Sequence, residues 1–400
     1  MIFNTWMFAA FAVITLVIYW LAVPQRFKPH YIVVAGCIFY VYSVPAYLIL
    51  ILALAILTYI VGVMMLRAKS DPRVKRLWLV LGVVAIVGVL ALFKYAKFFA
   101  LTVDEVLRHD VLPLPHLIVP LAISFFTFEF VHVLVDIYLG KIDRLDPLDF
   151  ATFAMFFPTL VAGPIKRYQS FAPQVRHIAA PPNETFALNL YRVVLGLTKK
   201  VVVADSMTLL TQPILTPIGD PFGRLDYIVA IFAYGAKIYF DFSGYSDTAI
   251  GTAGLLGIRI PENFSRPYWS QNISAFWRHW HMSLSSWVRD YVFIPLGGSR
   301  RAPVLTALNL FIAMAIAGLW HGAAWTFVVW GLWHGAGLAA HRMWSMQVVP
   351  RVAWLSNPGR LMPAASTALT FAFVFVGWVL FAASSFGNAA IVIKRAFGGG

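Results

Sequence analysis

The sequence predicts an all-α protein that crosses a membrane several times. Hydrophobic residues make up 60% of its 400 residues and charged residues only 12%, which is too little charge to cover a soluble surface. Apolar runs recur along the chain, and several approach the ~20 residues that a helix needs to cross a bilayer. The 16% aromatic content, with 14 tryptophans, is typical of proteins that place rings at membrane interfaces.

The apolar runs mark the expected helices in chain order. They lie at 6–23, 31–44, 46–66, 77–93, 114–139, 227–257, 303–320, 322–344 and 366–386. The run at 227–257 is long enough for two short passes. We expect it to break at Asp241–Gly244, because Asp, Ser and Gly are turn-forming residues. The runs at 303–320 and 322–344 predict another hairpin.

Two further stretches predict helices that do not cross. Residues 150–163 are too short to span and suit a re-entrant or interfacial segment that is protected by protein. Residues 186–211 mix apolar and basic positions, which indicates an interfacial helix. We expect one transmembrane domain over residues 1–400, without a soluble domain or linker.

Basic residues set the expected topology, because cytoplasmic loops of membrane proteins carry an excess of Lys and Arg. They gather at 26–28, 67–76, 141–144, 259–301 and 342–360, and an uncharged turn at 43–45 separates the first two groups. With these groups inside, the N-terminus lies outside the cell membrane. The net charge of +14 therefore favours contact with anionic lipid rather than nucleic acid, since no basic face lies outside the loops.

Ionisable residues within the apolar segments are candidate functional residues, because burying them costs several kcal/mol unless they are paired. They are Glu129, His132, Asp136, Asp241, Asp247, His279, His281, His321 and His334. The pentapeptide Gly-Leu-Trp-His-Gly occurs twice, so that His321 and His334 lie 13 residues apart. That spacing is about 220° around an unbroken helix, so the two rings would not share a face. Each copy is either a site or a packing repeat whose histidine bonds to a carbonyl.

Residues 276–291 combine histidines with aromatic residues. His279 and His281 are two positions apart, so on one helix they cannot both face a single site. The stretch is alternatively an amphipathic surface helix. Its rings then form an interfacial belt of Trp277, Trp280, Trp287 and Tyr291.

Other chemistries find less support. Glu129 and His132, with Asp136 following, have the spacing of a bundle metal pair, but a second Glu-x-x-His is missing and we expect no metal. The alternative is a buried polar cluster. Lys166 and Arg167 could meet an anionic cofactor at the inner face, or could be ordinary cytoplasmic charge. A hydrolase elbow and a phosphate-binding glycine motif are both missing from the sequence.

Long stretches of the chain resemble a known family. They are FWRHWHMSLSSWVRDYVFIPLGGSR (276–300), YFDFSGYSDTAIG (239–251), NFSRPYWSQNISAFW (263–277), AGLWHGAAWTFVVWGLWHG (317–335) and LVAGPIKRY (160–168). These stretches are similar to the bacterial membrane-bound O-acyltransferases (MBOAT), in the branch of the alginate O-acetyltransferases. The resemblance implies a helical enzyme of the bacterial inner membrane that moves an acyl group, usually acetyl, from a cytoplasmic donor to an extracytoplasmic hydroxyl.

The resemblance also implies site residues. The family's invariant histidine falls on His321 and its second polar site residue on His281, whereas the residues alone do not choose between His321 and His334. Neutral His321 then suits the role of base, and His281 could orient the donor, stabilise an oxyanion or relay a proton. An unbroken helix from Pro303 would carry His321 about 27 Å from the cytoplasmic side.

The resemblance further implies acetyl-CoA as donor, with no bound cofactor. It implies a polysaccharide acceptor such as alginate, membrane lipid around the chain and a periplasmic acetyltransferase partner. Transfer to peptidoglycan or of D-alanine are alternatives within the family. His279 stands where this branch is expected to have Arg, and the chain stops at Gly400, so we expect a shortened or incomplete C-terminal end. A transporter or flippase is the alternative of another class, since intramembrane Asp and His also suit transport.

Overall fold

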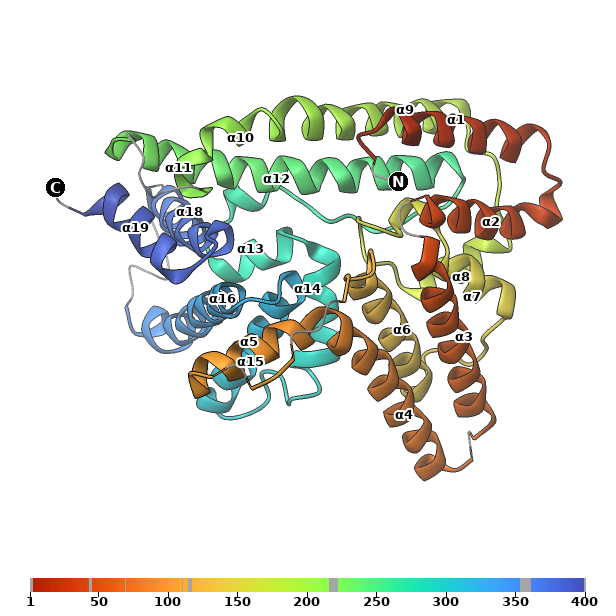
Figure 1. Cartoon of the computed structure of the whole chain (residues 1–400), viewed down its shortest axis with the longest axis horizontal. Helices are drawn as coiled ribbons and strands as arrows, with labels where there is room; N and C mark the ends of the chain where they lie inside the picture. The colour runs from red at the N-terminus through yellow and green to blue at the C-terminus, as the bar shows by residue number, and fades with distance from the viewer. Residues whose placement is uncertain are drawn as a thin grey trace. The chain divides into compact units, whose positions relative to one another are not determined.

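The structure is a computed structural model, and in the part of the chain that it describes all the regular elements are helices (Figure 1). It describes residues 3–42, 45–68, 70–109, 111–113, 117–215, 222–352 and 361–398. The all-α prediction is confirmed for these residues. The predicted turn at Ser43 and Val44 and the predicted inside charges Lys69 and Arg360 lie outside the described residues.

The chain forms two compact units. The first contains Met1–Leu197 and Tyr245–Pro261, and the second contains Thr198–Gly244 and Glu262–Gly400. Helix α12 contributes residues to both. The expectation of one transmembrane domain stays a prediction, and each unit is described by itself.

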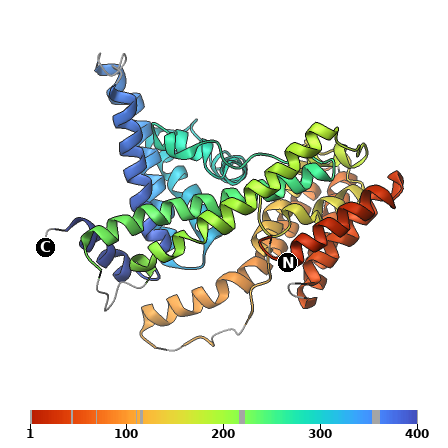
Figure 2. The ribbon, with the colours of Figure 1, turned by 90° about the horizontal axis from the view of Figure 1, so that it is seen from above.

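The first unit begins with helices that match the predicted apolar runs. They are α1 (Trp6–Leu21), α2 (Lys28–Val41), α3 (Pro45–Arg67), α4 (Pro72–Leu90) and α6 (Ile123–Tyr138). Helix α5 (Ala96–Leu107) lies between two predicted runs and was not predicted. A π-helical turn at Ala91–Tyr95 joins α4 to α5, and a short 3₁₀ turn at Gln25–Phe27 precedes α2. Helices α1 and α2 lie side by side (Figure 2), and α3, α4 and α6 contact one another.

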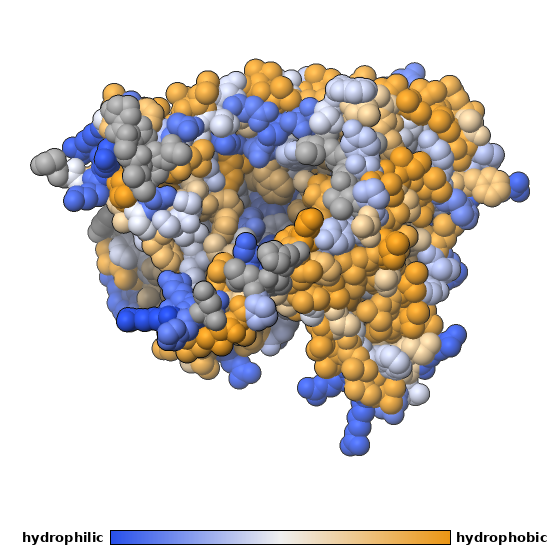
Figure 3. Space-filling model, viewed as in Figure 1, coloured by the Kyte–Doolittle hydropathy of each residue, from blue (hydrophilic) through white to orange (hydrophobic). Residues whose placement is uncertain are grey.

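The face of α3 and α4 that is seen in Figure 3 is mainly apolar, as a lipid-facing surface requires. Figure 3 shows hydrophobic residues along both helices and hydrophilic residues gathered at the loop that joins them. That loop is one of the predicted basic groups, with Arg67, Arg73 and Lys75. The alternation of apolar helix and basic loop fits the charge rule for membrane proteins.

The later part of the first unit contains the segment predicted not to cross. It folds as α7 (Pro147–Ala154) and a 3₁₀ turn (Phe157–Thr159), followed by α8 (Tyr168–Val175) and α9 (Asn183–Leu197). The side chain of Asp146 accepts hydrogen bonds from the backbone N–H groups of Leu148 (3.0 Å) and Asp149 (3.2 Å), and so caps α7. Phe153, Phe156 and Phe157 are fully buried, so this segment is covered by protein, as expected.

Four of the described helices are long and apolar enough to cross a membrane. They are Pro45–Arg67, the continuous stretch Pro72–Leu107, Pro303–His321 and Leu361–Ala382. Trp6–Leu21 is apolar but shorter.

The second unit begins with short helical turns and ends with longer helices. Its elements are a π-helical stretch (Thr198–Ala204), α10 (Met207–Leu210), α11 (Gln212–Leu215), α12 (Arg224–Leu255), a 3₁₀ turn (Pro267–Trp269), α13 (Ile273–His279), α14 (Met282–Val288), a π-helical turn (Arg289–Phe293), α15 (Pro303–His321), α16 (Trp325–Met343), turns at Trp344–Val348 and Val349–Arg351, α18 (Leu361–Ala382) and α19 (Phe386–Phe397). The interfacial helix predicted at 186–211 is therefore divided among α9, the π-helical stretch and α10.

The predicted break in the run at 227–257 is wrong, because α12 is one unbroken helix of 32 residues. Asp241 does not turn back to bond the backbone, since its carboxylate pairs with Lys200 Nζ at 2.8 Å. Gly244 also keeps helical geometry, because it is not among the glycines with positive φ. Turn-forming residues do not end a helix when their side chains find partners elsewhere.

The predicted hairpin of α15 and α16 is confirmed, and glycines allow the two helices to approach closely (Figure 1). A Cβ added at Gly318 would lie 2.1 Å from the carbonyl oxygen of Phe327, and one at Gly331 would lie 2.2 Å from that of Met314. These glycines open the two Gly-Leu-Trp-His-Gly copies, one on each helix. The repeat is therefore a helix contact of small residues, whatever its histidines do.

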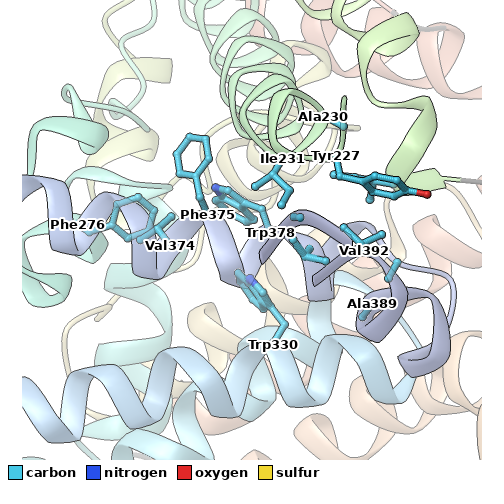
Figure 4. Packing of buried hydrophobic residues seen from close by; sticks show 14 of the residues in the cluster. Tyr227, Ala230, Ile231, Phe276, Trp330, Val374, Phe375, Trp378, Ala389 and Val392 are labelled. Carbon is cyan, nitrogen blue, oxygen red and sulfur yellow. The ribbon is translucent and has the colours of Figure 1, made fainter. Parts of the chain in front are cut away.

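The core of the second unit is aromatic. Figure 4 shows Trp330 on α16 directed toward α18, where Trp378 and Phe375 project between α12 and α16. The rings of Trp330 and Trp378 stack with centroids 5.9 Å apart. This core joins α12, α13, α16, α18 and α19 around the histidines described next.

Candidate functional site

His321 is the last residue of α15, at the tip of the hairpin. The chain is extended at Gly322, and α16 begins at Trp325. The predicted unbroken helix from Pro303 to His321 is confirmed. The side chain is only partly buried, so it sits at the boundary between the protein interior and open space.

His281 lies in a break between α13 and α14, not on a continuous helix. Its backbone is left-handed, with φ 43° and ψ 54°, and α14 starts at the next residue. A non-glycine residue with this conformation is uncommon, although histidine is among those found there more often. The break turns His281 inward, where it is 1% exposed.

The structure brings the two predicted catalytic histidines together. The ring centroids of His281 and His321 lie 6.3 Å apart. Four aromatic rings have centroids within 6 Å of one of these histidines. They are Phe242 (4.5 Å from His281), Trp320 (5.7 Å from His281 and 4.9 Å from His321), Trp330 (5.3 Å from His321) and Phe381 (5.1 Å from His321). We call this set the histidine chamber. Its apolar walls would strengthen any electrostatic interaction made inside it.

The imidazole of His281 is available for a new contact. Its Nε2 atom is buried and has no hydrogen-bond partner. Burial lowers the pKa of His281 well below its ordinary value, and the neighbouring His321 lowers the pKa further. His281 is therefore neutral near pH 7, and it can donate or accept one hydrogen bond at that nitrogen.

His334 lies in the same aromatic core but in a closed position. It is fully buried, neither ring nitrogen has a hydrogen-bond partner, and its ring lies 4.9 Å from that of Trp330 and 5.1 Å from that of Trp277. Because the hairpin folds back, His321 and His334 both contact Trp330, although they could not share a face of one helix.

The aromatic residues around His281 do not form an interfacial belt. Trp277, Trp280 and Trp287 are at most 8% exposed, so the belt interpretation is wrong for them. They face inward because the break at His281 divides the stretch into two short helices. His279 points elsewhere, and its Nδ1 lies 3.3 Å from Ser270 Oγ.

The other acidic candidates are ion-paired. Asp241 and Asp205 share Lys200, with N–O distances of 2.8 and 2.7 Å. Asp247 pairs with Arg192 at 2.9 Å within the first unit. Each carboxylate thus has a structural partner, and the role of Asp241 as a polar site residue stays a prediction.

Lys166 is buried in the first unit, where its Nζ lies 2.6 Å from Glu129 Oε1 and 4.4 Å from the ring centroid of Phe153. Neither side chain of the pair is more than 5% exposed. The cation is therefore already neutralised. The contact of Lys166 and Arg167 with an anionic donor stays a prediction.

The polar cluster of α6 is held by hydrogen bonds. His132 Nε2 accepts the backbone N–H of Tyr168 at 3.2 Å, and its Nδ1 lies 3.3 Å from the carbonyl oxygen of Phe128. Asp136 accepts from Lys141 and Gln169. Within the described residues, no three His, Cys, Asp or Glu side chains are grouped as a metal would need.

A cavity of about 570 Å³ lies in the second unit, between α13, α14, α15 and α16. Its walls are mainly apolar, and the polar residues among them are Ser274, Ser285, Ser286, Arg278 and Arg289. On α15 the lining residues Leu310, Ala313, Met314 and Ala317 are spaced as one helical face. His321 is the next residue on that face, four positions and about 6 Å beyond Ala317.

Sequence reasoning missed several residues of this site. Trp330 and Phe381 were not singled out, because an aromatic residue in an apolar run is usually core. In the sequence, Arg278 and Arg289 belong only to a basic group that is expected on the cytoplasmic side. Their positions on either side of His281 are the one signal that they share a cavity. Asn263, which holds that break, was hidden within a non-helical stretch.

Comparisons with known proteins show the family to which the sequence is similar. The model of MBOAT, the membrane-bound O-acyltransferase family, matches residues 74–386. The chain is 36% identical over 365 residues to a probable alginate O-acetylase of Pseudomonas aeruginosa, an alignment that covers 90% of this chain and 68% of the relative.

Two further relatives act on other polymers. The chain is 34% identical to a peptidoglycan O-acetyltransferase of Helicobacter pylori, over 93% of this chain and 74% of the relative. It is 30% identical to a teichoic acid D-alanyltransferase of Bacillus subtilis, over 68% of this chain and 71% of the relative. All three names describe the transfer of an acyl group.

Proposed function

The chain belongs to the membrane-bound O-acyltransferase family and is a membrane O-acyltransferase, and we propose that it moves an acetyl group from cytoplasmic acetyl-CoA to a hydroxyl group outside the bacterial inner membrane. The observation that carries the proposal is the pairing of His281 and His321 within one set of aromatic rings, with ring centroids 6.3 Å apart. The N-terminus lies on the extracytoplasmic side, as the basic loops favour.

His321 is the general base of the reaction. It takes the proton from the acceptor hydroxyl, whose oxygen attacks the thioester carbonyl carbon. A new C–O bond forms, the C–S bond breaks, and the departing thiolate receives the proton from the His321 imidazolium. A positioned base of this kind contributes roughly 10²–10⁴ in rate.

His281 stabilises the oxyanion that forms on the carbonyl oxygen. Its buried Nε2 has no hydrogen-bond partner, and a neutral imidazole can present an N–H there. A donor of this kind acts most strongly in a dry, apolar surrounding, which the rings of Phe242 and Trp320 provide. His321 rather than His334 is the base, because His321 is partly exposed whereas His334 is fully enclosed.

The acyl donor enters through the cavity beside α15. The lining combines a long apolar wall with Arg278, which suits a molecule with an extended thioester arm and phosphate groups. The second arginine of the lining, Arg289, is paired with Asp290 at 2.9 Å. Arg278 and Arg289 belong to the basic group at 259–301, which the charge rule favours on the cytoplasmic side. The lining on α15 leads toward His321, which would bring the thioester to the chamber.

The final acceptor of the acetyl group is a polysaccharide of the alginate type. This choice rests on the probable alginate O-acetylases, which align with 90% of this chain at 36% identity. The teichoic acid D-alanyltransferase is more distant. We expect a periplasmic acetyltransferase to act as partner and to carry the acetyl group from this chain to the polymer, with lipid surrounding the helices.

Labelled acetyl-CoA added to one side of vesicles that contain the purified protein tests the proposal. We expect covalent label on alginate oligosaccharides supplied on the other side, alone or with the periplasmic partner, and less on peptidoglycan fragments. Label that crosses the membrane without becoming covalently attached to any acceptor would favour a transporter and contradict the proposal.

A further inference from the structure

Asn263 holds the backbone directly after His281 in the break between α13 and α14. It lies in the non-helical stretch before α13 and is fully buried. Its carbonyl oxygen accepts the N–H of Met282 at 2.9 Å, directly after His281. Two residues farther along, the N–H of Ser265 donates to the carbonyl oxygen of His279 at 3.0 Å, directly before the break. The stretch 263–265 therefore clamps the turn from both ends.

Asn263 also performs the capping that His281 does not. His281 is the N-cap residue of α14, yet its side chain makes no capping hydrogen bond. An N-cap side chain normally accepts the N–H two or three residues later. Here the N–H of Ser283 donates instead to Asn263 Oδ1 at 3.3 Å, and the Ser283 hydroxyl donates to the same atom at 2.6 Å.

Because Asn263 caps α14, the imidazole of His281 can point in another direction. A histidine that capped α14 itself would have its ring turned toward the backbone of that helix. Because Asn263 satisfies the first two N–H groups, the ring of His281 faces Phe242 and His321 instead, at 4.5 and 6.3 Å. The same bonds offset the left-handed backbone at φ 43°, a conformation that is unfavourable for an L-residue.

We propose that Asn263 is a positioning residue of the acyl transfer, which caps α14 in place of His281 and so keeps the imidazole of His281 directed at His321. The proposal rests on the proposed function, because it gives His281 a role in the reaction. Asn263 itself does not touch the reacting atoms. It acts through the orientation of one ring.

The variant Asn263→Leu keeps the size of the side chain and removes the Oδ1 atom that accepts from Ser283. The backbone carbonyl oxygen that accepts from Met282 remains. We expect kcat for acetyl transfer to fall by about 100-fold, as a misplaced catalytic group does, with little change in KM for acetyl-CoA. In the His281→Ala background, the same substitution should cost almost nothing further, because its target is already gone. A merely structural residue would reduce the remaining activity in both backgrounds.

Asn309→Leu is the matched control. Asn309 is also a buried asparagine of the second unit, and its Nδ2 donates to the carbonyl oxygens of Leu296 and Gly298 at 3.2 Å each. It holds a different turn, and neither histidine takes part in the hydrogen bonds described for it. We expect a lower thermal midpoint in both variants but a specific loss of kcat only in Asn263→Leu.

Two results would overturn the proposal. One is an Asn263→Leu enzyme with near wild-type kcat while His281→Ala is impaired. The other is an equal loss from Asn263→Leu with and without His281. Full activity of His281→Ala would instead contradict the proposed function itself, so the two failures are distinguishable.

Discussion

Buried ionisable groups are treated differently in the two units of this protein. In the first unit they are paired: Glu129 with Lys166, Asp136 with Lys141, and His132 with the backbone N–H of Tyr168. In the second unit, His281 Nε2 and both nitrogens of His334 are buried without a hydrogen-bond partner. Leaving such an atom unsatisfied costs roughly 1–3 kcal/mol.

The difference indicates which polar groups hold the fold and which can react. A paired charge has already used its electrostatic interaction and resists a ligand. An unsatisfied imidazole beside a second, partly exposed imidazole gains from contact with a substrate. The sequence placed Glu129, His132 and the four histidines from 279 to 334 in one category, and only their partners separate them.

Replacing His321 should produce the largest change. His321→Ala should reduce turnover by roughly 10²–10⁴ because the acceptor hydroxyl loses its base. The fold should survive, since the side chain lies at a helix end and is only partly buried. The rate of acetyl transfer by the detergent-purified protein measures turnover, and its thermal midpoint measures whether the fold survives. A rate near that of the wild type would contradict the assignment.

Replacing His281 should have a large but smaller effect. His281→Ala removes the proposed oxyanion donor, which is worth roughly 10²–10³ in kcat, and leaves the base in place. The ratio of kcat to KM for acetyl-CoA should fall by a similar factor, since the interaction is made only in the transition state. If turnover stayed within twofold of the wild type, His281 would be a packing residue.

Most of the fold could be predicted from the sequence, because apolar length and periodicity decide where membrane helices lie. The helices α3 and α15 match their predicted runs closely. The predicted break at Asp241 failed because turn propensity is local, whereas the ion pair that ties this residue to Lys200 is formed by distant chain segments. Pattern reasoning sees the residue but not its partner.

The candidate site could be predicted only in part. His321 and His281 came from the family resemblance, and the residues alone left His321 and His334 equivalent. What separates these two is tertiary: one ends a helix, and the other is enclosed by rings from three helices. The inward turn at His281 depends on Asn263, and no periodicity in the sequence signals that contact.

Breaking the pair of Lys166 and Glu129 tests whether the paired groups of the first unit hold the fold. Lys166→Met leaves a buried carboxylate without its cation, which should destabilise the protein by about 3–5 kcal/mol. The double variant with Glu129→Leu should recover most of that loss. Thermal unfolding of the purified proteins measures it. A stable Lys166→Met variant with a raised KM for acetyl-CoA would show instead that Lys166 contacts the donor.

Replacing an exposed arginine should change donor binding rather than stability, unlike replacing the buried Lys166. Arg278 lines the cavity, and its guanidinium bonds only to the Ser274 hydroxyl among the contacts described, at 3.0 Å. Arg278→Ala should raise KM for acetyl-CoA by about tenfold, the scale of one hydrogen bond to a charged group, and leave stability unchanged. Arg300→Ala, outside the lining, is the control. Equal KM values for the two variants would place the donor elsewhere.

The smallest effect is expected at His334. Its replacement tests whether a buried nitrogen without a hydrogen-bond partner is necessarily a reactive one. His334 resembles His281 in lacking hydrogen-bond partners but is enclosed by the rings of Trp277, Trp330 and Phe373. His334→Leu replaces two buried nitrogens by apolar atoms of similar volume, so stability should change by less than about 1.5 kcal/mol. Turnover should also stay close to that of the wild type. A loss as large as that of His321→Ala would mean that both copies of Gly-Leu-Trp-His-Gly carry the chemistry, and that enclosure by aromatic rings does not exclude a substrate.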